Sequence, residues 1–174
     1  EAGSIERVVY EGYGPGGAAV LVEALTDNRN RTGSEVRHAF DRHGGSLGEP
    51  GSVAWQFEKK GVVVVDGARH GEDDLMVAID AGAEDVLDDD GELRVTTAPT
   101  ELAVVRRALE AEGIAVSSSE LTMQPKSVVE ISDPGEARAL VRLMDALDDH
   151  DDVDEVHANF DIGADLLEAV QATA

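Results

Sequence analysis

Residues 8–25, VVYEGYGPGGAAVLVEAL, contain two candidate strands and the turn between them. Two apolar, β-prone runs, Val8 to Gly14 and Ala18 to Leu25, are joined by Pro15-Gly16-Gly17. This combination is a strong turn signal, because proline fixes φ and glycine reaches left-handed conformations. We therefore expect residues 8–25 to form a β-hairpin.

A helix is predicted after this hairpin, from about Gly33 to His43. Thr32 is followed three residues later by Glu35, which is the pattern of a capping box at a helix start. Apolar residues then recur at helical spacing until Gly44-Gly45 ends the pattern. They are Val36, Ala39 and Phe40. A strand is expected next, from Val53 to Phe57.

The middle of the sequence has the element order β-α-β-β-α-β, which is the ferredoxin-like arrangement. Its first strand is the apolar run 62–65, and Asp89-Asp90-Gly91 marks a hairpin turn. The other expected strands cover residues 84–88, 92–97 and 114–121, and the expected helices cover residues 72–81 and 99–113.

A third helix is signalled by Asp133 as cap, Pro134 at the first helical position and Glu136 two residues later. A strand at 153–160 and a final helix from Ala164 follow.

These elements predict an α+β protein of two domains. Residues 61–126 form the ferredoxin-like domain, which is inserted into a discontinuous α+β domain made of residues 1–60 and 127–174.

The composition describes a soluble, acidic, globular protein: 42% of residues are hydrophobic, 29% are charged, and the net charge is −23. The sequence has no cysteine, which excludes disulfides, thiolate nucleophiles and thiolate-bound zinc and fits a reducing compartment. No apolar run approaches the ~20 residues that cross a bilayer, so no membrane association is expected and a cytoplasmic location is predicted. Because the sequence opens on Glu1, we expect it to be a piece of a longer protein.

Long ungapped segments of this sequence resemble the YebC family of gene-expression regulators and its mitochondrial relatives. The matching segments are residues 10–19 (YEGYGPGGAA), 26–32 (TDNRNRT), 35–40 (EVRHAF), 44–48 (GGSLG), 51–61 (GSVAWQFEKKG) and 151–153 (DDV), with Asn159. The resemblance implies the family's two C-terminal α+β domains, the last inserted in the middle one. The basic three-helix domain that precedes them in the family is absent from this sequence.

The resemblance implies a non-enzymatic regulator of gene expression whose full-length form is a DNA-binding transcriptional regulator. An alternative is a ribosome-associated translation factor, or translational activator, that contacts ribosomal RNA. A third reading is a protein-interaction module. Nucleic acid would be bound mainly through the missing basic domain, protein partners are possible, and a monomer is expected.

One region could attract a polyanion, because residues 29–60 hold six basic residues against four acidic ones. At ~100° per residue, His38 and Arg42 lie on the helix face opposite the apolar residues and should point to solvent. The helix start near Thr32 would add backbone donors. The alternative for Arg29 and Arg31 is a structural role in pairing with carboxylates. The candidate nucleic-acid or anion-binding residues are Arg29, Arg31, Arg37, His38, Arg42, Lys59 and Lys60.

Other motifs favour no catalytic, metal or cofactor site. The glycines at 12–17 lack the following helix and the lysine-serine pair of a phosphate loop. The run Asp88-Asp89-Asp90-Gly91 lacks the ligand spacing of a calcium loop, and the residues at 148–152 are typical of a solvated acidic turn. No nucleophile elbow or zinc-protease motif is present. The sequence therefore predicts no enzyme, no metal and no cofactor.

Overall fold

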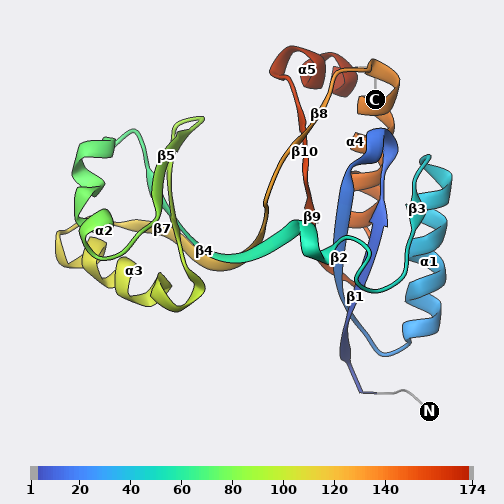
Figure 1. The fold of residues 1–174 in the computed structure, drawn as a ribbon, viewed down its shortest axis with the longest axis horizontal. Coiled ribbons are helices and arrows are strands. Elements are labelled where there is room, and N and C mark those ends of the chain that lie inside the picture. Colours follow the sequence, from blue (N-terminus) through green and yellow to red (C-terminus); the bar gives the residue numbers. More distant parts are fainter. Residues whose placement is uncertain (1–3, 173–174) are drawn as a thin grey trace. The chain divides into compact units, whose positions relative to one another are not determined.

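The computed structural model describes residues 4–172 and divides into two compact units. The first unit consists of Glu1–Glu58 and Pro125–Ala174, and the second of Lys59–Gln124. The chain leaves the first unit in strand β4 (Phe57–Asp66) and returns to it in strand β7 (Val116–Pro125) (Figure 1).

The first unit is built on an antiparallel sheet with strand order β3-β1-β2-β9. The predicted hairpin is confirmed, since β1 and β2 pair from Glu6 opposite Thr26 to Tyr13 opposite Ala19. Gly16 and Gly17 have φ values of 76° and 82°, which explains why glycine is needed in the turn. The bounds are β1 Glu6–Tyr13, β2 Ala19–Thr26, β3 Ser46–Leu47 and β9 Val153–Ala158.

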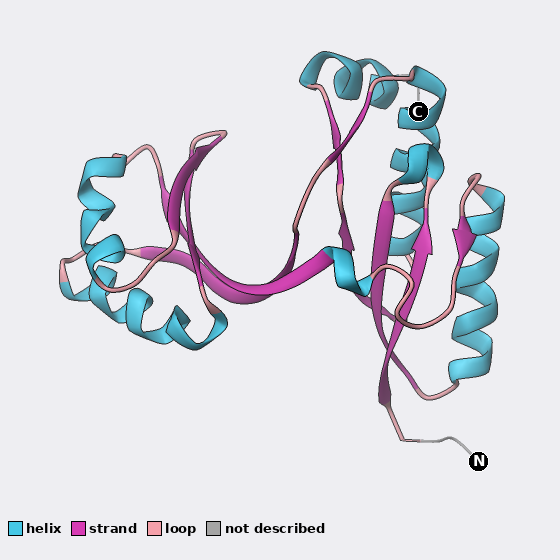
Figure 2. Ribbon diagram, viewed as in Figure 1, coloured by secondary structure: helices cyan, strands magenta, loops and turns pink. Residues whose placement is uncertain are grey.

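Helices α1 (Arg29–Arg42) and α4 (Pro134–Asp148) pack on one face of this sheet (Figures 1 and 2). Alternate residues of β2 point towards them, and every third or fourth residue of each helix points back. The predicted start of α4 is confirmed, because the carboxylate of Asp133 accepts a hydrogen bond from the N–H of Glu136 at 2.9 Å. The fully buried core contains Val20, Val22, Val36, Phe40, Leu143 and Leu147.

The predicted start of α1 was wrong by four residues. The helix begins at Arg29, and the side chain of Asn28 caps it by accepting from the N–H of Arg31 at 3.1 Å. Thr32 is buried inside the first turn, where its hydroxyl contacts Thr26 and Asp152 at 2.8 Å. The capping-box pattern gave the wrong start because Asn28, four residues before Thr32, already accepts a hydrogen bond from the first turn of the helix.

The predicted strand from Val53 to Phe57 was also wrong. Residues 54–56 form a 3₁₀ turn, and only Phe57 is extended. The cause is the carboxylate of Glu11, which accepts from the N–H groups of Val53 at 3.0 Å and Ala54 at 2.7 Å. Backbone groups bound to a side chain in this way cannot join a strand ladder.

The predicted strand 153–160 is interrupted at Asn159. Its side-chain oxygen accepts from the N–H of Ala19 at 2.7 Å, and the chain continues in β10 (Phe160–Ile162). Strand β10 pairs in parallel with β8 (Val129–Ile131), which was not predicted. Helix α5 packs with them and with the first half of α4 in a second core of the first unit. It spans Ala164–Ala172.

The second unit has the order β4-α2-β5-β6-α3-β7 and a sheet in the order β5-β6-β4-β7, which is the ferredoxin-like topology. The predicted α+β class is thus confirmed. The hairpin turn between β5 and β6 carries Asp90 at φ 50° and Gly91 at φ 85°. The bounds are α2 Met76–Asp80, β5 Asp85–Asp89, β6 Glu92–Thr97 and α3 Leu102–Ala111. Among the helices of residues 4–172, none combines the length and the apolar composition of a membrane-spanning helix.

Candidate nucleic-acid interface

Helix α1 carries most of the candidate anion-binding residues, but it places them in different surroundings. Residues three and four apart share a helix face, so Arg31, His38 and Arg42 follow one stripe. Arg29 and Arg37 lie on another. His38 and Arg42 are exposed, as expected from the sequence.

Arg31 is held by carboxylates at the start of the stripe. Its guanidinium lies 2.8 Å from Asp152, 3.5 Å from Asp27 and 3.6 Å from Glu35. Hydrogen bonds from Arg31 and Thr32 lower the pKa of Asp152 below its ordinary value. The positive charge of Arg31 is therefore matched within the protein, in agreement with the structural alternative for this residue.

The C-terminal part of the stripe has the opposite character. His43, at the end of α1, has a lowered pKa because of burial and the positive charges of Arg42, Arg142 and His38. Within residues 4–172, no carboxylate lies in ion-pair distance of these four residues. We call them the cationic cluster, which consists of His38 and Arg42 of α1, His43 directly after the end of α1, and Arg142 of α4. Its two arginines supply the positive charge, because the lowered pKa of His43 favours the neutral imidazole.

The packing of α1 against α4 explains why the start of α1 is paired with carboxylates and its end is not. Arg31 and Glu35, near the start of α1, meet Asp152 and His150, which follow the end of α4. The helices are thus antiparallel, and the end of α1 lies beside Arg142.

Arg29 and Arg37 line a surface hollow of about 380 Å³ beside β1 and residues 47–50. Glu11 and Glu49 line the same hollow, and the Arg29 guanidinium is 3.8 Å from Glu6. This hollow therefore carries mixed charge.

Lys59 and Lys60 belong to the second unit. The ammonium of Lys60 lies 2.7 Å from Glu84, whereas Lys59 is exposed. Of the seven predicted residues, the structure brings together His38 and Arg42, to which it adds His43 and Arg142. It also brings Arg29 and Arg37 together, in the hollow of mixed charge. Sequence reasoning missed Arg142 because nothing local in a sequence indicates which residue of a distant helix packs beside α1.

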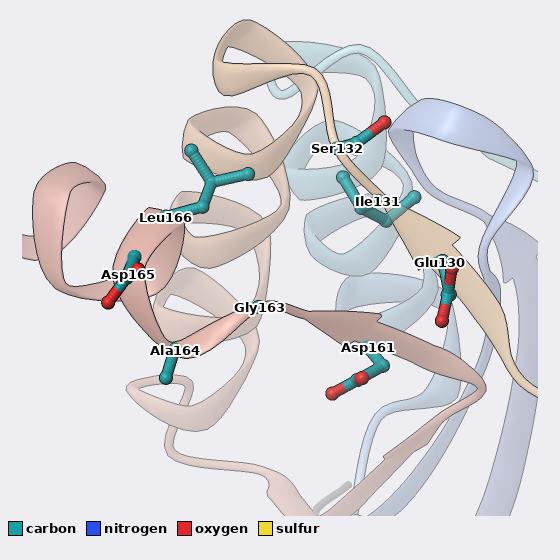
Figure 3. A pocket seen from close by; sticks show the side chains of 8 residues that line it. All are labelled: Glu130, Ile131, Ser132, Asp161, Gly163, Ala164, Asp165 and Leu166. Carbon is teal, nitrogen blue, oxygen red and sulfur yellow. The ribbon is translucent and has the colours of Figure 1, made fainter.

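Another hollow, of about 510 Å³, lies between the end of β8 and the segment where β10 leads into α5 (Figure 3). Three carboxylates line it, from Glu130, Asp161 and Asp165. Figure 3 shows Asp165 on the far side of the hollow from Glu130 and Asp161. Negative charge makes this surface unsuitable for a phosphate backbone.

Fold and charge together define the class: an acidic α+β protein with an inserted ferredoxin-like unit and a local cationic helix surface. A family model described as the second and third domain of TACO1/YebC matches residues 5–160. The chain therefore belongs to the TACO1/YebC family.

Relatives and a solved structure agree with this membership. A protein of Desulfotalea psychrophila is 54% identical over 94% of this chain and 66% of its own length. One of Rubrobacter xylanophilus is 52% identical over 98% of this chain and 68% of its own. Both are described as probable transcriptional regulatory proteins. The crystal structure of a conserved hypothetical protein from Aquifex aeolicus has a TM-score of 0.84 and 45% identity, covering 94% of this chain and 68% of that one. The chain thus spans about two thirds of these relatives.

Proposed function

We propose that this chain is the acidic part of a non-enzymatic regulator of transcription, and that its cationic cluster contacts the phosphate backbone of DNA. The relatives' description as transcriptional regulatory proteins supports the regulatory role. The cluster itself carries the proposal, because its charges have no carboxylate partner within residues 4–172 of a protein with a net charge of −23.

Electrostatics limits what the cluster can do alone. A polyanion is repelled by the protein as a whole and attracted only within about a Debye length of a local positive surface, about 8–10 Å. The guanidinium groups of Arg42 and Arg142 can each neutralise one phosphate. The cluster would therefore orient DNA, while a basic preceding domain of the kind found in the family would supply most of the affinity.

The test replaces Arg42 and Arg142 with glutamate in the longest form of the protein that its gene encodes. Both side chains are exposed, so the fold should survive. Binding to a labelled promoter duplex is measured by fluorescence anisotropy across a salt series. Loss of two phosphate contacts should weaken binding and make the slope of log K against log salt shallower by about 2.

The matched control is the double change Arg106→Glu and Arg107→Glu in α3. It alters net charge equally but lies in the second unit. This control should keep the wild-type salt slope. If both double variants showed the same DNA affinity and the same salt slope, the cationic cluster would not contact DNA. The protein could instead co-sediment with ribosomes, in a way that depends on Arg42 and Arg142, and fail to bind the promoter. That result would favour the translation factor over the transcriptional regulator.

A further inference from the structure

Three side chains of metal-ligating types meet on the sheet face that points away from α1 and α4. Glu23 lies in β2, and Glu155 and His157 lie in β9. The register places Glu155 directly opposite Glu23, and His157 follows two residues along the same strand. Alternate and paired residues of neighbouring strands share a face, while Val22 and Val156 point to the helix side.

The ligand atoms have the spacing that a small cation needs. Nε2 of His157 is 2.8 Å from Oε2 of Glu23 and 3.4 Å from Oε2 of Glu155. All three donor atoms lie within 4.8 Å of one another. A tetrahedral zinc ion with bonds of about 2.0–2.2 Å holds its ligands about 3.3–3.6 Å apart. Small side-chain adjustments would therefore suffice.

The local charge also favours a cation. Carboxylates directly opposite each other on antiparallel strands repel, as Glu23 and Glu155 do here. The guanidinium of Arg7 is 2.8 Å from Oε1 of Glu23 and 3.7 Å from Asp154, so its single positive charge is shared between two carboxylates. Arg7 uses the Glu23 oxygen that His157 leaves free, which keeps Oε2 available.

The site is half-enclosed. The side chains of His157 and Glu23 are 10% and 18% exposed, whereas Glu155 is 43% exposed. The two less exposed ligands are held in place by the sheet, and the open side leaves room for a water molecule as a fourth ligand.

We propose that Glu23, Glu155 and His157 bind a divalent transition-metal ion, with Zn²⁺ as the best fit. One imidazole nitrogen with carboxylate oxygens suits zinc, whereas calcium and magnesium select oxygen ligands alone. In the occupied site Nε2 of His157 binds the ion and Nδ1 carries the proton. No hydrogen bond within residues 4–172 engages Nδ1. Arg7 holds Glu23 from outside the ligand set.

The chain offers a matched control pair. Nε2 of His150 lies 2.7 Å from a carboxylate oxygen of Glu35, much as His157 meets Glu23. However, Nδ1 of His150 accepts from the N–H of Asp152 at 3.1 Å, so its proton stays on Nε2. That nitrogen is therefore not free to bind a metal ion.

The experiment titrates Zn²⁺ into the chain against a chromophoric chelator, which suppresses weak binding to the many surface carboxylates. Imidazole signals are followed by NMR in the same titration. The wild type should bind one zinc ion with a shift of the His157 ring. His157→Gln should weaken binding at least about tenfold, and His150→Gln should leave it unchanged.

A second variant keeps the test decisive if His157→Gln unfolds, which circular dichroism would reveal. Glu155→Gln changes a more exposed residue and should also weaken zinc binding about tenfold or more. The proposal is overturned if the wild type shows no saturable zinc binding, or if folded His157→Gln or Glu155→Gln binds zinc like the wild type. None of these outcomes depends on DNA binding.

Discussion

At the scale of single residues, buried Glu11 shows how one side chain can shape a loop. It is 6% exposed, and its carboxylate accepts from the N–H groups of Gly51, Val53 and Ala54 at 2.6, 3.0 and 2.7 Å. Burial alone would raise its pKa, but these three hydrogen bonds outweigh burial and lower it. Glu11 thus fixes residues 51–54 against β1.

We expect Glu11→Gln to lower the free energy of unfolding by about 1–3 kcal/mol at pH 7, because an amide leaves buried N–H groups without an acceptor. A group with a lowered folded-state pKa stabilises the fold above its unfolded pKa, and this contribution disappears as pH falls through the folded value. Urea denaturation at several pH values should therefore show wild type and variant converging below about pH 4. The exposed Glu168→Gln serves as control, and a constant difference down to low pH would contradict the role of Glu11.

At the scale of elements, helix α1 is anchored to the fold at its first turn and exposes positive charge at its last turn. Its first turn is tied by Arg31 and Thr32 to Asp152, which anchors the helix to the turn after α4. Its last turn presents Arg42, which together with Arg142 of α4 acts on His43 and has no carboxylate partner in the described part of the chain. The anchored start fixes the direction of the helix and so determines where the exposed end lies.

The start of α1 leads to a stability prediction. Asn28→Ala removes the cap at the N–H of Arg31 and should cost about 1 kcal/mol, as for other N-caps. Thermal and urea unfolding of the chain would measure this loss. Ser34→Ala is the control, because Ser34 is exposed in the helix interior and alanine favours helix. If Asn28→Ala were as stable as the wild type, the Asn28 cap would contribute nothing to the stability of the fold.

At the scale of the whole molecule, the second unit has the features of an independent folding unit. Its core is separate from those of the first unit and includes Val63, Leu75, Leu93, Val105 and Leu109. Its first and last strands, β4 and β7, are neighbours in one sheet. The two ends of the insertion are therefore held together by the second unit itself.

We therefore expect residues 59–124 to fold as an isolated fragment. NMR spectra of the fragment should show dispersed amide signals that overlay on those of the same residues in the whole chain. Leu93→Ala, in the fragment's core, should cost about 2–5 kcal/mol and abolish this dispersion. A wild-type fragment that is unfolded would show that the second unit depends on the first.

The sequence alone determined the α+β class, the first hairpin, the start of α4 and the ferredoxin-like order, because these follow from local turn signals, caps and hydrophobic periodicity. It also indicated that His38 and Arg42 are exposed. Tertiary packing set the pairing of Arg31 with Asp152, the approach of Arg142 to the end of α1, and the contact of Glu23 with His157. These contacts join residues about a hundred or more positions apart, and helix packing and strand register, which set them, depend on the whole core.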